Sequence, residues 1–203
     1  MKAKFLTIAT IVTLALGTAT ATFANDNKNN NEEATTTLTN VSKINKIELR
    51  GNVELYVSDG AADQVKVYNK YYSENALVQN QDGVLRISSY TGKKLVVWVT
   101  ANDLKAITAF DNAEVKSFGD LSKIDLDVTL NNNASADLKL DAYKANINVN
   151  DRAKANISGK VDEYSLTQDQ SATVNNSNLV ATNASKTVTN KFVKADNAEL
   201  AIL

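Results

Sequence analysis

Two residue types that carry much of protein chemistry are missing from this chain of 203 residues, which contains neither cysteine nor histidine. Without histidine there can be no Ser-His-Asp triad and no His-ligated zinc site, because histidine is the commonest general base and metal ligand. Without cysteine there is no disulfide and no lipobox cysteine to carry a lipid. Small secreted eukaryotic domains usually have disulfides, so an exported chain of this composition fits a bacterial envelope better.

Arginine is also scarce, and the three arginines fall in separate segments, at Arg50, Arg86 and Arg152. A β-helical polysaccharide lyase or hydrolase, the enzyme class nearest to this sequence, needs acidic or basic side chains that converge on a groove. Neighbouring acids such as Asp125 and Asp127 have the spacing of ordinary solvated positions. We therefore expect no catalytic residues, no metal site and no cofactor.

The first 24 residues have the three parts of a secretory signal peptide. Lys2 and Lys4 form the charged region, residues 5–17 carry no charge, and small residues lead to Ala24. The alternative, a membrane anchor, needs roughly 20 apolar residues to span a bilayer, and this run is shorter. We expect cleavage after Ala24 and export to the periplasm, the outer cell surface or the medium, with no later transmembrane segment.

Charge is nearly balanced in the rest of the chain. The full sequence has 22 basic and 23 acidic residues, and loss of the two leader lysines would change the net charge from −1 to −3. A nucleic-acid-binding protein needs a basic patch, and this chain lacks the composition for one. We therefore exclude a nucleic-acid partner.

Residues 25–41 are polar and almost free of apolar side chains, so we predict a disordered spacer there and a single domain over residues 42–203. From residue 41 to residue 100, apolar and polar residues alternate with period two, which is typical of half-buried strands. Turn-like residues separate these runs at 50–52, 58–60, 81–83 and 91–93. We predict about six short strands, mostly antiparallel, because Gly with Asn or Asp favours tight hairpin turns.

Residues 101–203 contain a repeat of roughly 20 residues, the length of one coil of a parallel β-helix. Its units begin at Ile107, Val128, Ile147, Tyr164 and Lys186, which are 21, 19, 17 and 22 residues apart. Each unit has two alternating apolar residues, then Asp, Asn or Gln, then small residues. Because one repeat cannot bury its apolar side alone, the pattern predicts an all-β fold with a right-handed parallel β-helix-like solenoid in its second half. A β-sandwich is the alternative, and helices are disfavoured.

One polar residue of each unit would stack above the next at a bend of the solenoid. This column contains Asp111, Asn132, Asp151, Gln168 and Asn190. Carboxylate and amide oxygens could bind a cation such as calcium. They could also bond to one another and to the turn backbone, and Asn and Asp tolerate the left-handed conformation of such corners. We favour the structural ladder, because no calcium-loop spacing is present.

Aromatic residues gather in the first half of the chain. Tyr71, Tyr72, Tyr90 and Trp98 are the candidates for an exposed platform on which a glycan could stack. The alternative is that these rings belong to the core or form cross-strand pairs.

Three segments resemble the head GIN domain family, which comprises adhesin-like surface domains chiefly of Bacteroidetes. They are Ile44–Val57 (INKIELRGNVELYV), Asp82–Ile87 (DGVLRI) and Asn102–Ile107 (NDLKAI). The resemblance implies a β-helical fold and an envelope location, and it carries over no catalytic residue. The chain departs from the family pattern at the bends, where Asp111, Asn132, Asp151 and Gln168 stand in place of glycine.

Together these observations favour an exported, non-catalytic envelope domain that acts as an adhesin or ligand-binding module. Its partner would be a glycan or a surface protein. A periplasmic scaffold without a small ligand is the second hypothesis, and a carbohydrate-active enzyme is the third.

Overall fold

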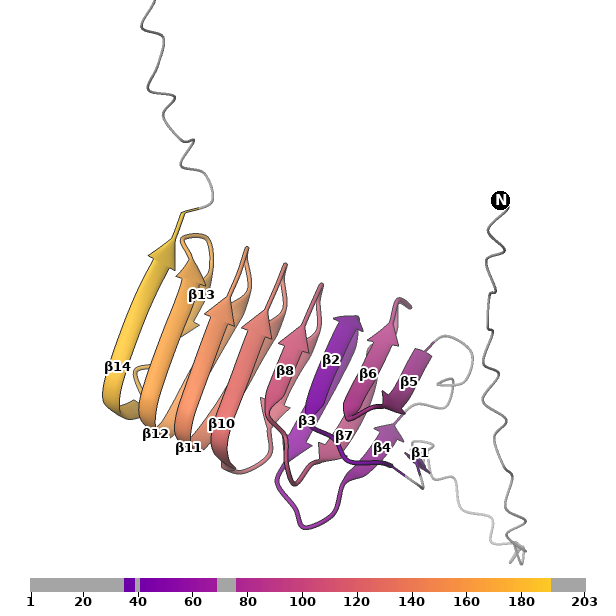
Figure 1. Ribbon diagram of the computed structural model, residues 1–203. Helices are drawn as coiled ribbons and strands as arrows, with labels where there is room; N and C mark the ends of the chain where they lie inside the picture. The colour runs from indigo at the N-terminus through magenta and orange to yellow at the C-terminus, as the bar shows by residue number, and fades with distance from the viewer. Residues whose placement is uncertain (1–34, 39–40, 69–75, 191–203) are drawn as a thin grey trace, which may run out of the picture. The chain divides into compact units, whose positions relative to one another are not determined.

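The computed structural model describes residues 35–38, 41–68 and 76–190, and within these ranges it contains strands and no helix. The described strands form one curled, mixed sheet of 14 strands (Figure 1). The strands of the first half are β1 (Thr35–Leu38), β2 (Lys46–Gly51), β3 (Val53–Ser58), β4 (Gln64–Tyr68), β5 (Ala76–Gln81), β6 (Val84–Ser89) and β7 (Leu95–Thr100). Those of the second half are β8 (Ala106–Ala109), β9 (Glu114–Ser117), β10 (Leu121–Leu130), β11 (Ser135–Val149), β12 (Lys154–Asp169), β13 (Thr173–Asn175) and β14 (Leu179–Thr189).

The sheet folds over on itself, so that its strands lie in two layers (Figure 1). The front layer contains β5, β6, β2, β8 and the later parts of β10, β11, β12 and β14. The back layer contains β1, β4, β7, β3, β9, β13 and the earlier parts of β11 and β12. The long strands β11 and β12 pass from the back layer to the front one through a bend, without a break in their pairing.

Parallel pairing holds the second half together. Val128 pairs with Ile107, Ile147 with Val128, Leu166 with Ile147, and Lys186 with Leu166, at offsets of 21, 19, 19 and 20 residues. The four apolar members of this column are buried, whereas Lys186 in the last strand is exposed. The apolar residues at these positions therefore lie side by side on paired parallel strands.

The first half, predicted to be mostly antiparallel, has mixed pairing. Strands β2 and β6 pair in parallel, as do β3 and β7, and only β1–β4, β4–β7 and β5–β6 are antiparallel. The turn at residues 50–52 leads from one layer to the other, and Gly51 makes this corner with a φ of 80°. Only the Asp82-Gly83 turn, with φ values of 51° and 78°, closes a hairpin between neighbouring strands.

The predicted spacer also needs a correction at its end. Thr35–Leu38 form β1, which pairs antiparallel with β4, although this segment was expected to be disordered. Its three consecutive threonines favour a strand, because β-branched residues pack well on a pleated surface. The signal peptide and residues 25–34 lie outside the described residues, and these boundaries stay predictions.

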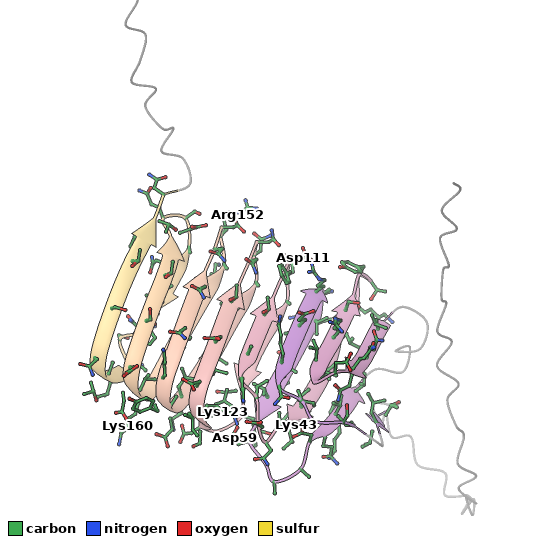
Figure 2. The ribbon with its side chains drawn as sticks, viewed as in Figure 1. Lys43, Asp59, Asp111, Lys123, Arg152 and Lys160 are labelled. Carbon is green, nitrogen blue, oxygen red and sulfur yellow. The ribbon has the colours of Figure 1, made fainter. Side chains whose placement is uncertain are left out.

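At the bend opposite the Asp111 corner, a partly buried ion pair ties segments that are distant in sequence. The Lys123 ammonium pairs with Oδ1 of Asp59, and only 5% of the Lys123 side chain is exposed (Figure 2). Asp59 also accepts the Ser122 N–H through Oδ2 at 2.5 Å. Because an uncompensated buried charge is costly, this contact fixes the start of β10 to the loop that follows β3.

Candidate functional site

The polar residues at one edge of the stack form a ladder of hydrogen bonds between coils. Asp111, Asn132 and Asp151 all have the left-handed conformation, with φ values of 63°, 61° and 57°. Each backbone N–H donates to the side chain of the next coil, from Asp111 to Asn132 Oδ1 (3.3 Å) and from Asn132 to Asp151 Oδ2 (3.0 Å). At the start of the ladder, the Gly51 N–H donates to Asp111 Oδ2 at 3.2 Å.

Asp169 takes the place in the ladder that was expected for Gln168. Its Oδ2 accepts the Asp151 N–H at 2.8 Å, and its Oδ1 accepts the Thr189 hydroxyl at 2.6 Å. Gln168 lies inside β12, where its Oε1 is buried without a hydrogen-bond partner in the described part of the chain. The unit start was misplaced, because Leu166 rather than Tyr164 is the register partner of Ile147. At that offset of 19 residues Asp151 corresponds to Gln170, and the accepting carboxylate comes from Asp169, one residue before it.

The last predicted member, Asn190, is exposed just after β14. The other side-chain oxygens accept backbone N–H groups at a corner that would otherwise leave these donors unpaired. The side-chain oxygens of the ladder therefore have a structural role, which is to accept hydrogen bonds from the backbone of the neighbouring corner.

We predict that Asn132→Ala lowers the free energy of unfolding by about 2 kcal/mol. The variant loses one hydrogen bond, and alanine is more strained than asparagine in the left-handed conformation. Asn132→Gly should lose about half of that, because glycine adopts positive φ without strain. Urea unfolding of both variants measures the difference. Equal losses in the two variants would contradict a role for backbone strain at this corner.

The structure describes two of the four residues of the predicted aromatic platform, Tyr90 and Trp98. Tyr71 and Tyr72 lie outside the described residues. Tyr90 is 73% exposed and lies beside Gly51 at the corner after β6, whereas Trp98 projects outward from β7 in the back layer. The structure therefore separates the two described members of the predicted set.

Trp98 instead belongs to a ring cluster, which we define as Tyr56, Tyr68, Trp98 and Phe118. Tyr56 and Trp98 are register partners in β3 and β7, and their rings stack with centroids 4.8 Å apart and planes at 22°. Tyr68 and Phe118 meet Trp98 at tilted angles, with centroid distances of 6.2 and 5.2 Å. Phe118 is 62% exposed.

Ring orientation decides what this cluster can bind. The faces of Tyr56 and Trp98 that meet are closed to a ligand, and the Lys116 ammonium lies 5.6 Å from the centroid of the Tyr56 ring. A sugar stacks on an open ring face, so this arrangement is less suited to a glycan than a flat platform would be. A protein partner can use ring edges and the exposed Phe118, and Trp and Tyr are enriched where protein interfaces gain most affinity.

An ionic network borders the ring cluster. Glu54 contacts the ammonium of Lys116 at 2.5 Å and that of Lys94 at 3.8 Å, and it accepts the Tyr56 hydroxyl at 2.9 Å. Glu114 pairs with Lys94 at 2.7 Å and with Lys116 at 3.6 Å. The charges of two acidic and two basic side chains therefore cancel beside the ring cluster.

These contacts shift the ionisation of the network. Burial raises the pKa of Glu54, but the hydrogen bonds from Lys116 and Tyr56 outweigh it and leave this pKa below its ordinary value. The hydrogen bond to Glu54 raises the pKa of Lys116 and also that of Tyr56. At neutral pH, Glu54 and Lys116 are therefore charged and the Tyr56 phenol is protonated.

Because the folded-state pKa of Glu54 is lowered, the stability that it contributes is present above its unfolded pKa of about 4.3 and is lost as pH falls through the folded value. We predict that Glu54→Gln is less stable than the original chain at pH 7 and that the gap narrows below about pH 4. Urea unfolding across this range tests the sign. A gap that is the same at acid and neutral pH would contradict the assignment.

Sequence reasoning missed Phe118 and the grouping of Tyr56 and Tyr68 with Trp98. One signal was available in the sequence. Tyr56 and Trp98 each lie between two buried apolar residues of an alternating run, so both side chains are expected to point outward. The pairing of β3 with β7 and β9, which brings the rings together, could not be read from either run alone.

One comparison with known proteins identifies a family. A family model described as "Putative auto-transporter adhesin, head GIN domain" matches residues 43–190. A search of curated proteins returned no match. Among the residues that the structure describes, no helix is long and apolar enough to cross a membrane.

Three crystal structures share the fold at low sequence identity. A putative adhesin from Parabacteroides merdae is 18% identical, with 78% of each chain covered and a TM-score of 0.61. A putative adhesin from Parabacteroides distasonis is 19% identical, with 78% of this chain and 80% of that chain covered and a TM-score of 0.58. A protein from the same species described as a putative lipid binding protein is 10% identical, with 76% and 78% covered and a TM-score of 0.57.

Proposed function

This chain belongs to the head GIN domain family of putative auto-transporter adhesins, and from that premise we propose that it is an exported, non-catalytic module that binds a protein partner at the cell envelope. Export is supported by the predicted signal peptide, which places the chain where an adhesin-like module would act. The family and the similar structures are described as adhesins or as lipid-binding, and none of these descriptions names an enzyme.

We also propose that the coils form a right-handed parallel β-helix-like solenoid. The constant parallel register of β8, β10, β11, β12 and β14 supports this architecture. Crossovers between parallel strands of one sheet are right-handed in nearly all proteins, which supports the hand. Such a stack offers long, rigid outer faces for a partner.

The observation that carries the binding proposal is the ring cluster on the outer side of the back layer. Four rings meet there, and Phe118 is 62% exposed beside an ionic network without net charge. Exposed rings with polar residues around them are typical of sites where proteins bind one another. The closed faces of Tyr56 and Trp98 favour a protein over the glycan that the sequence left open.

A bead-adhesion assay tests this surface. Beads coated with the full chain should bind to at least one immobilised protein among fibronectin, laminin, collagen and mucin. Phe118→Ala should reduce the bound fraction by about tenfold, which is the effect of removing a side chain that makes a modest hot-spot contribution. Val180→Ala is the matched control, because Val180 is 67% exposed but lies in β14 at the far end of the stack. Equal loss in both variants, or none in either, would overturn the assignment to the ring cluster.

Location needs its own test. Protease treatment of intact source cells, followed by antibody detection, should degrade the protein if it lies on the outer surface. Protection until the outer membrane is permeabilised would place it in the periplasm, and the scaffold hypothesis would replace adhesion.

A further inference from the structure

A groove of mixed polar and apolar lining runs across the front layer just after the bend of β11 and β12. It has a volume of about 310 Å³, within the usual range of ligand pockets. Its polar lining comprises Lys144, Asn146, Glu163, Ser165, Asn183 and Ser185. This groove lies in the other layer from the ring cluster and does not depend on it.

The lining residues form two rows along the stack. Lys144, Glu163 and Asn183 are register partners in β11, β12 and β14, and one alternation further on the partners are Asn146, Ser165 and Ser185. Neighbouring strands lie about 4.8 Å apart, so polar groups recur at that spacing across the groove. A ligand that lies along the stack would therefore meet a polar group at each strand.

The chemistry of these rows fits a neutral ligand rich in hydroxyl groups. Amide and hydroxyl side chains can each donate and accept hydrogen bonds, as sugar hydroxyls also do. The charges of Lys144 and Glu163 cancel across one rung. One amide is oriented already, because Asn146 Nδ2 donates to Asp127 Oδ1 at 2.7 Å and leaves its own oxygen available to a ligand.

An exposed ring stands beside the groove. Tyr143 is 54% exposed, and its hydroxyl donates to Oε1 of Glu163 at 3.2 Å, which holds the ring next to the two rows. This hydrogen bond raises the pKa of Tyr143 and keeps the phenol protonated. Unlike Tyr56 and Trp98, Tyr143 has no ring stacked on it among the described residues.

We propose that this groove binds a neutral oligosaccharide, with one sugar on the Tyr143 ring and its neighbours bonded to the two polar rows. The proposal adds a glycan site to a protein-binding module, and each surface can fail without the other. Glycan binding was expected from other aromatic residues, and the groove assigns it to a different place in the fold.

Titration of the ¹⁵N-labelled full chain with maltohexaose and with chitohexaose, each to about 10 mM, tests the site, because isolated sugar sites often bind in the millimolar range. At least one of the two should shift the amides of Asn146, Glu163 and Asn183 and leave those of the ring cluster unchanged. Tyr143→Ala should weaken binding at least tenfold, and Phe118→Ala should not change it.

Three outcomes would overturn the proposal. These are no shifts with either sugar, shifts confined to other residues, and unchanged affinity in Tyr143→Ala. Tyr143→Phe distinguishes stacking from hydrogen bonding, because it keeps the ring and removes the hydroxyl, and it should retain more affinity than the alanine variant. A hyaluronan hexasaccharide that binds as tightly as the neutral sugars would also overturn it, because the groove has no net charge to favour an acidic ligand.

Discussion

The whole structure depends on the burial of apolar side chains along its parallel strands. Ile107, Val128, Ile147 and Leu166 form a continuous buried column, which requires each of these strands to pair with the next. Apolar burial is the main favourable term in folding, so the parallel register is also the main source of stability. In the groove, Asn146 and Ser165 alternate with Ile147 and Leu166 of this column and point outward.

Two kinds of polar contact hold the register at the edges of the stack. At one edge, the Asp111 ladder satisfies backbone N–H groups at corners where the strands cannot. At the other, Lys123 and Asp59 form a partly buried pair (Figure 2). Gly159 adds a steric constraint inside β12, because a Cβ there would lie 2.0 Å from the carbonyl oxygen of Leu140. These contacts therefore restrict any shift of one strand along the next and keep the outer faces rigid.

The local alternation of apolar and polar residues predicted where strands occur better than it predicted which strands pair. The spacing from Ile107 to Ile147 predicted the coil, because period-two burial and a repeat of about 20 residues are visible in the chain itself. The same alternation carries no information on strand direction, so the parallel partners of β2 and β3 were missed. Gln168 was placed in the ladder because the unit was started at Tyr164 instead of Leu166, whereas Asp169 is the residue that accepts the Asp151 N–H. The ring cluster and the groove depend on pairing between distant strands, and no local signal specifies either.

Lys186 has a consequence for how such a chain could change in length. It occupies the position of the last coil that corresponds to the buried Leu166, so a further apolar coil stacked on β14 would have to bury an ammonium group. Duplication of one repeat unit between Ile107 and Leu166 meets no such barrier, because every position in that column is already apolar. Gene duplication would therefore lengthen this protein from within, and each added unit would extend the outer faces while both ends stayed as they are.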